Sequence, residues 1–363
     1  MKRKKLLWIN ASPLKIAGGT ESHSVDFINS LSKRKNIDLY VAVSKGSFID
    51  KNINIPPDKK VYITIRSEFA PLAFFNLTKF AKKIKPDFVV GNNGKEYINT
   101  YLAGKIAKAK VLLFRHMTNK QPIFLRKYIL SNIYKILAVS DYVKESLVNQ
   151  KLTNVEVIPN FLSLNFSYDM KKRINFRKKF NINNKKVFLF VGRIEKGKGI
   201  FDFINFIKEV YNKDKNILAY VVGDGTDAKN AKKLVKSLKL NNVFTFTGVV
   251  SNVWDYYLLS DFFIMPSYAD ESFGRTAIEA MSMKNVVIAY PAGNVKFLIK
   301  NGENGFITKN KNYLQILEIY ENVKENVSYL NKIKENAYEF SNKNFSEKAV
   351  VDKFIDLILE EPN

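Results

Sequence analysis

Residues 186–200 read KVFLFVGRIEKGKGI, and this stretch decides the fold. Its first half is a continuous apolar run, which is typical of a parallel β-strand buried on both faces. Three glycines and several basic residues follow, and then an amphipathic segment begins. A glycine-bearing turn between a buried strand and a helix predicts one unit of an open α/β sheet.

The same alternation of apolar runs and amphipathic stretches extends in both directions along the chain. Two consecutive series of such units predict two α/β domains, each a doubly wound parallel sheet. The later series continues through ILAYVVGDG, VFTFTG, DFFIMPS and NVVIAY, and the earlier one comprises KLLWINA, DLYVAVS, VYITI, DFVVGNN, VLLFRH and KILAVS.

The segment that follows VEVIPNF is polar and basic and lacks a clear strand, so it separates the two series. We therefore place an N-terminal domain at 1–162, a linker near 163–172 and a C-terminal domain at 173–343. The last residues, 344–363, read as one amphipathic helix that is expected to cross back onto the N-terminal domain.

The chain has 363 residues and no cysteine, so disulfides and thiolate metal sites are excluded. The basic start MKRKK precedes only four apolar residues, whereas a signal peptide needs roughly 7 to 15. No stretch approaches the ~20 apolar residues of a membrane-spanning helix. These features predict a cytoplasmic protein.

Positive charge is concentrated in the first part of the chain. Residues 1–151 hold 28 Lys or Arg against 10 Asp or Glu, a net of +18, whereas the remainder holds 31 against 24, a net of +7. A basic half indicates an anionic partner such as a nucleic acid, an acidic polymer or a membrane surface. The alternative is that a composition rich in Lys and Asn only decorates the surface.

Three glycine-bearing turns follow predicted strands. Glycine lets a ligand approach the backbone, and a helix N-terminus presents N–H groups to an anion. Two cations in the middle turn suit a diphosphate, although a solvated basic loop is the alternative. The turns contain Gly18 and Gly19; Gly192, Gly197 and Gly199 with Arg193 and Lys198; and Gly223 and Gly225 around Asp224.

Residues 266–281 read PSYADESFGRTAIEAM and carry two glutamates eight positions apart. We expect Glu271 in the loop after a strand and Glu279 in the first turns of the next helix. A carboxylate accepts hydrogen bonds from two adjacent hydroxyls, so each glutamate suits a vicinal diol. Alternatively, Glu271 caps the helix and Glu279 is an exposed helical acid.

Together these motifs resemble the family-4 retaining glycosyltransferases, whose two Rossmann-like domains facing across a cleft form the GT-B fold. The resemblance covers nearly the whole chain and is strongest over 186–310. It rests on GRIEKGKG (192–199), VGDG (222–225), FTG (246–248) and PSYADESFGRTAIEAM (266–281), and, in the N-terminal half, on AGGTE (17–21), His116 in LLFRHM, AVSDYVKESL (138–147) and VIPNF (157–161).

The resemblance implies a role for each motif residue in binding a nucleotide-sugar donor. Arg193 and Lys198 would hold the diphosphate, Glu271 the transferred sugar and Glu279 the ribose hydroxyls. The remaining implied positions are Ser272, Phe273 and Gly274 for backbone N–H groups, Gly18 and Gly19 for closure over the phosphates, Gly192, Gly223 and Asp224 along the donor, and His116 near the sugar.

The resemblance also implies an activity: a retaining hexosyltransferase that moves a sugar from a nucleotide-diphosphate sugar, with a UDP-sugar favoured. The expected acceptor is a cell-surface glycan, a lipid-linked molecule or an anionic polymer. No metal or other cofactor is expected, because Lys and Arg would stabilise the leaving phosphate and the chain has no Asp-x-Asp. A sugar-nucleotide epimerase or a phosphorylase of the same fold remains an alternative.

A nucleic-acid-binding protein is a more distant alternative, and no nucleic-acid partner is expected because no reading element is recognisable. The chain departs from the family pattern at Lys284, Val286 and Lys296, which leaves the donor identity open.

The basic stretch 71–87 carries Phe74, Phe75 and Phe80 among lysines, and it fits either a helix on an anionic membrane or an ordinary sheet-covering helix. The stretch 122–135 presents the same choice. A peripheral position on the inner face of the cell membrane is therefore one expectation.

Overall fold

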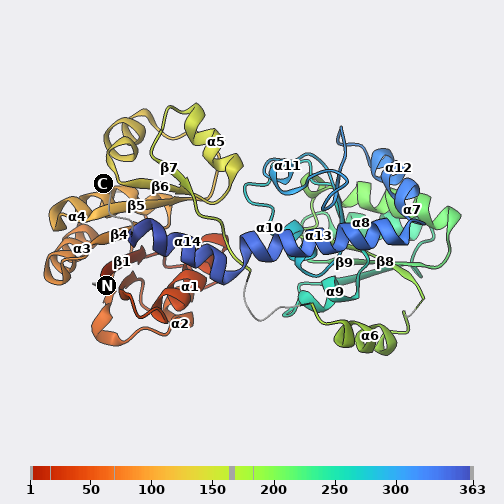
Figure 1. Cartoon of the computed structure of the whole chain (residues 1–363), viewed down its shortest axis with the longest axis horizontal. Helices are drawn as coiled ribbons and strands as arrows, with labels where there is room; N and C mark the ends of the chain where they lie inside the picture. The colour runs from red at the N-terminus through yellow and green to blue at the C-terminus, as the bar shows by residue number, and fades with distance from the viewer. Residues whose placement is uncertain (1–2, 17, 69, 163–167, 183, 360–363) are drawn as a thin grey trace. The chain divides into compact units, whose positions relative to one another are not determined.

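The computed structural model describes residues 3–16, 18–68, 70–162, 168–182 and 184–359. The chain divides into two compact units, which we call unit 1 (Met1–Phe161 with Glu347–Asn363) and unit 2 (Leu162–Ser346). Each unit is built on one parallel sheet with helices on both faces (Figure 1). The predicted class, two Rossmann-like α/β domains, is confirmed.

Unit 1 contains a seven-stranded sheet in the order β3-β2-β1-β4-β5-β6-β7, and every neighbouring pair is parallel. Its strands are β1 (Lys4–Asn10), β2 (Ile37–Val43), β3 (Lys60–Tyr62), β4 (Phe88–Gly91), β5 (Lys110–Arg115), β6 (Lys135–Ala138) and β7 (Val155–Val157). Its α-helices are α1 (Gly19–Ser32), α2 (Phe48–Asn52), α3 (Pro71–Ile84), α4 (Tyr97–Ala107), α5 (Asp141–Asn149) and α14 (Glu347–Leu359).

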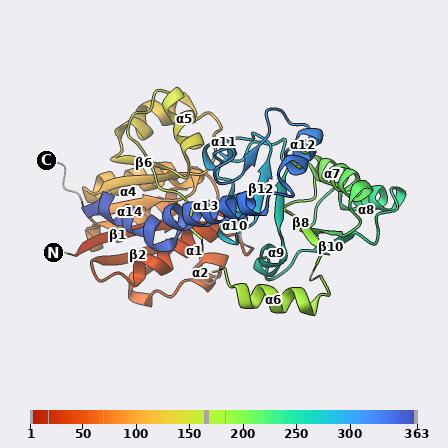
Figure 2. The same ribbon diagram turned by 45° about the vertical axis from the view of Figure 1, so that its right-hand side comes forward.

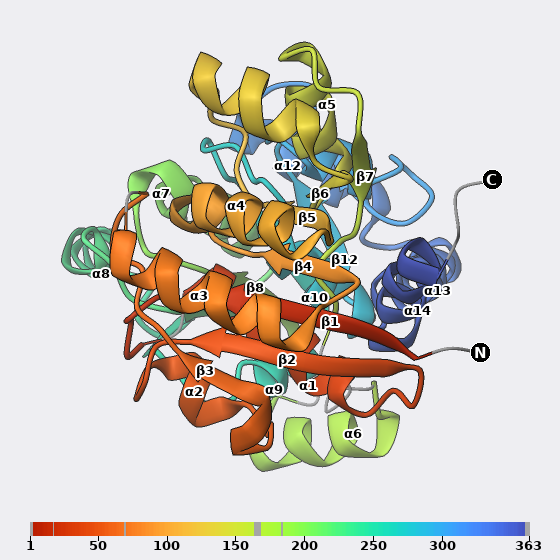
Figure 3. The same ribbon diagram turned by 90° about the vertical axis from the view of Figure 1, so that its left-hand side faces the viewer.

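The direction of the connections reverses between β1 and β4, which are neighbours in the sheet. Strand β1 leads through α1 to β2 on one side, and β4 leads through α4 to β5 on the other. Because such crossovers are right-handed, the two helices cover opposite faces. Figure 3 shows α3 and α4 side by side on one face of this sheet.

An aromatic cluster ties the last helix of the chain into unit 1. The ring of Phe354 on α14 lies 6.2 Å from Trp8, 5.7 Å from Phe27 and 6.3 Å from Phe114. All four side chains are fully buried. Ser30 on α1 also donates a hydrogen bond of 2.7 Å to Glu347 at the start of α14. Helix α14 is thus part of the hydrophobic core of unit 1.

Unit 2 contains a six-stranded parallel sheet in the order β10-β9-β8-β11-β12-β13. Its strands are β8 (Lys186–Val191), β9 (Ile217–Val222), β10 (Phe244–Gly248), β11 (Phe262–Met265), β12 (Val286–Ala289) and β13 (Phe306–Ile307). Its α-helices are α6 (Met170–Lys179), α7 (Ile200–Lys213), α8 (Ala228–Ser237), α9 (Trp254–Leu259), α10 (Arg275–Ser282), α11 (Val295–Leu298), α12 (Tyr313–Val323) and α13 (Val327–Phe345).

Helix α7 illustrates how the sequence pattern builds this unit. Its buried side chains include Ile200, Phe203, Ile204, Ile207 and Val210. These positions recur at the helical period and therefore form one apolar stripe facing the sheet. The strand–turn–helix unit expected from residues 186–200 is present as β8, a short turn and α7.

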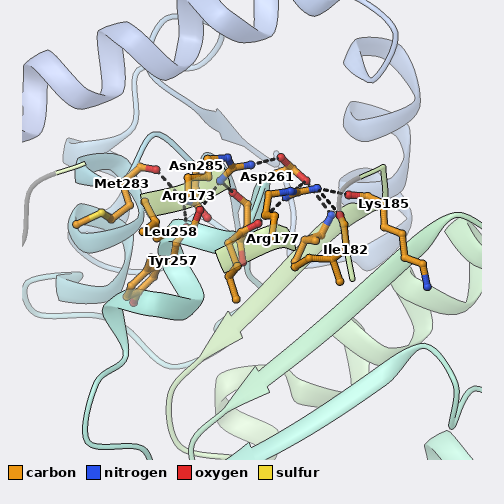
Figure 4. Close-up of polar contacts among 12 residues, drawn as sticks. Arg173, Arg177, Ile182, Lys185, Tyr257, Leu258, Asp261, Met283 and Asn285 are labelled. Atoms are coloured by element: carbon orange, nitrogen blue, oxygen red, sulfur yellow. Dashed lines mark hydrogen bonds and ion pairs between the residues drawn. The ribbon is translucent and has the colours of Figure 1, made fainter. Parts of the chain in front are cut away.

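The basic segment before β8 forms helix α6, which lies beside α9 (Figure 2). Arg177 donates a 3.2 Å hydrogen bond to Asp261, and Arg173 donates 2.5 Å and 2.7 Å bonds to the carbonyls of Leu258 and Ser260 (Figure 4). Asp261 also accepts the backbone N–H of Val187 at 2.9 Å. Two arginines therefore fasten α6 to the start of β11 and to β8.

The expected linker at 163–172 falls partly on residues 163–167, which lie outside the described residues, and its last residues belong to α6. The stretch 122–135 forms a turn of π-helix (η3, Leu125–Ile129) and a 3-10 turn (η4, Leu130–Asn132) before β6. Among the described residues, no helix is both long and apolar enough to cross a bilayer.

Candidate active site

The sheet of unit 2 also reverses its connections, in this case between the neighbouring strands β8 and β11. Ligands of open α/β sheets bind beyond the carboxyl ends of strands at such a switch point. A pocket of about 110 Å³ lies there. Its lining includes Gly192 after β8, Lys198, and Ser267 and Glu271 after β11, with Arg275 and Thr276 from the start of α10.

Lys198 and Glu271 form an ion pair in this pocket. Their Nζ and Oε1 atoms are 2.6 Å apart, and both side chains are largely shielded from solvent. Ser267 donates a second hydrogen bond of 3.1 Å to the same carboxylate oxygen. The backbone of Glu271 is held as well, because its carbonyl accepts the N–H of Asn294 at 2.8 Å. The pair is therefore positioned before any ligand binds.

Helices α7 and α10 both begin at this pocket with a glycine N-cap. Gly199 and Gly274 have φ angles of +77° and +83°, and neither helix start receives a side-chain cap. In unit 2, α12 is capped by Asn312 and α13 by Asn326, whereas α8, α9 and α11 also lack a side-chain cap. Uncapped helix starts leave N–H dipoles available to an anion.

Two glycines of these turns are required by the packing of the protein itself. A Cβ at Gly199 would lie 1.9 Å from the Pro266 carbonyl oxygen, and one at Gly223 would lie 2.0 Å from that of Gly192. At Gly223 the backbone of Gly192 therefore fills the space on the Cβ side. A Cβ at Gly192 would meet no atom within 4 Å, so the approach remains open there.

Glu279 is buried on α10, which excludes the alternative of an exposed helical acid. Tyr257 donates a hydrogen bond of 2.9 Å to its Oε2, and Arg275 contacts its Oε1 at 2.8 Å. Burial, reinforced by the negative charge of Glu279, raises the pKa of Tyr257 well above its ordinary value. Glu279 does not line the pocket of Lys198 and Glu271.

Arg193 and Asp224 lie outside the lining of this pocket. The Arg193 side chain is 70% exposed and pairs with Glu195 at 3.0 Å, and Glu195 also lies outside the pocket lining. Asp224 is exposed and accepts the N–H of Gly225 at 2.8 Å. Phe273 is a buried ring 5.8 Å from Phe345. The predicted loop of residues 272–274 immediately precedes α10, as expected.

The other expected residues, Gly18, Gly19 and His116, belong to unit 1. Helix α1 begins at Gly19 with Gly18 as its N-cap, and a Cβ at Gly19 would meet no atom within 4 Å. The Nε2 atom of His116 lies 3.2 Å from Asn92 Oδ1. Burial and the adjacent Arg115 lower the pKa of His116 to about 4, so its ring is neutral at neutral pH.

A second pocket, of about 530 Å³, opens at the switch point of unit 1. Four segments line it, namely Thr20 after β1, Glu68 after β3, residues 92–95 and 97 after β4, and residues 115–117, 119–122 and 125 at and after the end of β5. Most of these side chains carry amide, carboxylate or cationic groups, which bind sugar hydroxyls and anions.

Sequence reasoning missed the buried carboxylate beside this second pocket. Glu96 accepts the N–H of Ala11 at 2.6 Å and that of Asn93 at 3.3 Å. It thereby joins the ends of β1 and β4, and burial raises its pKa to about 8. The run GNNGKE after a predicted strand was the available signal, because polar residues directly after a parallel strand lie at the ligand-binding edge.

Comparison with known proteins covers both units. Residues 172–340 match the family model "Glycosyl transferases group 1", and residues 17–166 match "Glycosyltransferase Family 4". An uncharacterized glycosyltransferase of Methanocaldococcus jannaschii is 26% identical, over 98% of each chain. The alpha-monoglucosyldiacylglycerol synthase of Acholeplasma laidlawii is 28% identical, over 56% of this chain and 52% of that protein.

Among solved structures, the Anabaena protein HepE in complex with UDP superposes with a TM-score of 0.81, at 20% identity, over 97% of this chain and 98% of that chain. The family models do not favour an epimerase, a phosphorylase or a nucleic-acid-binding protein. With one glycosyltransferase model on each unit and a full-length glycosyltransferase relative, the chain belongs to the family-4 glycosyltransferases of the GT-B fold.

Proposed function

We propose that this glycosyltransferase is a retaining, metal-independent hexosyltransferase that uses a UDP-sugar. The observation that carries the proposal is the Lys198–Glu271 pair, held at 2.6 Å in the switch-point pocket beside the open backbone at Gly192. A cation and a carboxylate side by side match the two ends of a sugar diphosphate, because the cation binds phosphate and the carboxylate binds hydroxyls.

The reaction breaks the bond between the anomeric carbon and the diphosphate oxygen. Positive charge develops on the sugar and negative charge on the departing phosphate, so groups preorganised to receive that negative charge lower the barrier most. In this proposal Lys198 and the uncapped start of α10, which line the pocket, take up that negative charge. Arg193 joins them when its exposed side chain leaves Glu195 for the diphosphate. These groups supply the charge stabilisation that a metal ion supplies elsewhere.

Glu271 then orients the transferred sugar, and Glu279 binds the ribose hydroxyls. Each oxygen of Glu279 already has one protein partner. A carboxylate oxygen accepts two hydrogen bonds, so each retains capacity for one hydroxyl. Arg275 and Tyr257 fix the orientation of this carboxylate in advance.

Retention follows when the acceptor attacks from the face that the phosphate leaves. The acceptor hydroxyl forms the new bond to the anomeric carbon, and its proton passes to the departing phosphate oxygen, which leaves as UDP. No side-chain nucleophile is needed, and His116, neutral at neutral pH, serves as a hydrogen-bonding group.

We further propose that the acceptor belongs to the cell envelope: a glycan, an anionic polymer or a lipid-linked molecule at the inner face of the cell membrane. The basic first half of the chain supports an anionic or membrane-bound acceptor. The name of the Acholeplasma relative, a glucosyldiacylglycerol synthase, supports a lipid acceptor.

Thermal-shift screening with UDP-, GDP- and ADP-sugars tests the donor, and we expect the UDP-sugars to raise the unfolding temperature most. Transfer or hydrolysis of the selected donor, followed by proton NMR of the anomeric signal, tests retention. A first-formed product of inverted configuration would refute the retaining mechanism. Metal independence is tested by exhaustive chelation, after which we expect turnover to be undiminished.

A further inference from the structure

Strongly exposed apolar side chains gather at one edge of unit 1. Eight described residues of this unit are large, apolar and more than half exposed, and all of them follow β1, β3 or β5. They are Leu14, Ile16, Leu72, Phe75, Met117, Ile123, Phe124 and Tyr128. In unit 2 the comparable described residues are four, on four separate elements: Met170, Val249, Leu314 and Val327. Single exposed apolar residues are ordinary, whereas a gathered set marks an interaction surface.

Helix α3 presents two faces of different character. Its inner face packs on the sheet through small and aliphatic residues, among them Ala73, Leu77 and Ala81. Its outer face begins with Leu72, 83% exposed, and Phe75, 65% exposed. The same face continues with exposed lysines at 79, 82 and 83, which follow at helical spacing. Helix α3 thus covers the sheet and Phe80 packs against the core, as the sheet-covering interpretation expects, whereas Phe75 is exposed to solvent.

The segment after β5 has a similar division. Leu125 and Ile129 point into the core, whereas Ile123, Phe124 and Tyr128 are exposed. The rings of Phe124 and Tyr128 lie 5.3 Å apart, and Lys127 Nζ lies 5.5 Å from the Tyr128 ring. Two aromatic rings are thus paired in solvent beside a cation.

The sheet topology brings these segments to one edge. In the order β3-β2-β1-β4-β5, the carboxyl ends of β3, β1 and β5 are two strands apart. Neighbouring strands are about 4.8 Å apart, so the three ends span about 20 Å. Glu68 after β3 and Met117 and Pro122 after β5 line the same pocket. Of the eight exposed apolar residues, Met117 lines this pocket, and the others belong to segments that follow strands ending at the same edge.

The charge of these segments has one sign. Residues 14–16, 66–83 and 117–128 contain eight Lys or Arg and one acid, Glu68. Apolar residues at an edge with cations around them match the boundary of an anionic bilayer, where rings enter the acyl region and lysines remain among the headgroups.

We infer that this edge docks the enzyme onto an anionic lipid bilayer, with Leu72, Phe75, Ile123 and Phe124 inserted and the α3 lysines on the headgroups. The inference rests on the proposed function, which places the acceptor at a membrane. Docking through this edge turns the mouth of the unit 1 pocket toward the lipid surface. The headgroup of a lipid-linked acceptor then reaches the pocket without leaving the bilayer.

Vesicle flotation of the full chain tests this surface. We expect binding to phosphatidylcholine vesicles that contain phosphatidylglycerol and little binding to phosphatidylcholine alone at physiological salt. Phe75→Ser combined with Phe124→Ser lowers the partition coefficient roughly tenfold or more, because two rings lose their apolar contact. Val249→Ser combined with Val327→Ser removes equally exposed apolar groups from unit 2 and leaves partition unchanged.

The lysines have a closely matched control within the chain. Lys79, Lys82 and Lys83 on α3 have the same spacing as Lys229, Lys232 and Lys233, which are exposed on α8 of unit 2. Changing the α3 set to Gln weakens binding to anionic vesicles by about 100-fold, at roughly fivefold per lysine. The α8 set changed to Gln has a much smaller effect.

Three results would overturn the inference. One is equal loss of binding in both lysine sets, which indicates diffuse attraction to net charge. Another is a dimer in analytical ultracentrifugation that Phe75→Ser dissociates, which assigns the edge to a second copy of the chain. The third is binding to a soluble acidic polysaccharide but not to vesicles. UDP binding measured in the same variants separates this inference from the proposed function, because the donor pocket lies in unit 2.

Discussion

Replacement of Lys198 by alanine separates donor binding from folding. The lysine Nζ lies 2.6 Å from Glu271 Oε1, and the two side chains are 23% and 18% exposed. A partly exposed pair contributes about 1 kcal/mol to the free energy of unfolding. Glu271 keeps its hydrogen bond from Ser267 when the lysine is removed. We therefore expect the unfolding temperature to fall by only about 2–4 °C.

The effect on the donor is expected to be larger. A hydrogen bond to a charged group contributes about 1.5–3 kcal/mol, which corresponds to roughly a 10- to 150-fold loss of UDP affinity. Loss of a group that stabilises the departing phosphate lowers the turnover of a UDP-sugar about 100- to 1,000-fold. Calorimetry with UDP and release of UDP from the sugar donor measure the two quantities.

Lys196 provides the control, because it is an exposed lysine in the same turn and lies outside the pocket lining. We expect Lys196→Ala to bind UDP like the unmodified chain. Wild-type affinity in Lys198→Ala, or an equal loss in both variants, would refute the assignment of Lys198 to the diphosphate. A fall in unfolding temperature far beyond 4 °C would instead show that the pair serves mainly to stabilise the fold.

Three further outcomes are expected. Glu271→Gln keeps UDP affinity within a few-fold but lowers sugar turnover at least tenfold, and equal turnover would remove this carboxylate from the sugar site. Phe354→Ala on α14 lowers the free energy of unfolding by about 3–5 kcal/mol, measured by denaturant titration, because a fully buried ring leaves a cavity; a change below 1 kcal/mol would contradict its place in the core. Burial raises the pKa of Glu96 to about 8, from an ordinary 4.5, so the folded chain retains a proton that the unfolded chain releases, and the free energy of unfolding falls as pH rises between these values. Glu96→Gln flattens that slope in unfolding curves followed by circular dichroism, and an unchanged slope would exclude Glu96 as its source.

Local patterns predicted much of the candidate site in unit 2. The turn after residues 186–191 and the acid pair at 271 and 279 could be read from spacing alone, because strand, turn and helix follow one another directly in the chain. The pairing of Lys198 with Glu271 could not, since 73 positions separate them and a sheet crossover brings them together. The exposure of the Arg193 side chain could not be predicted either, because exposure depends on which residues pack around the turn.

The unit 1 pocket was predicted less well. His116 was identified from a motif, but Asn92 and Glu96 were not, although they follow a predicted strand. The hydrogen bond that the Ala11 N–H donates to Glu96 joins the ends of two strands that are adjacent only because the sheet order places β1 beside β4.

The sequence by itself determined the two α/β domains, the glycine-bearing turns after their strands, and the positions of Glu271 in a loop and Glu279 in the next helix, since each depends on residues close together in the chain. Only the tertiary structure decided that the Gly192 backbone packs against Gly223 and that Glu279 is buried and accepts a hydrogen bond from Tyr257. The tertiary structure also decided that the rings of Phe75 and Phe124 are exposed at one edge of unit 1. The physical reason is that hydrophobic periodicity acts over a few residues, whereas burial and contact depend on elements that meet across the whole chain.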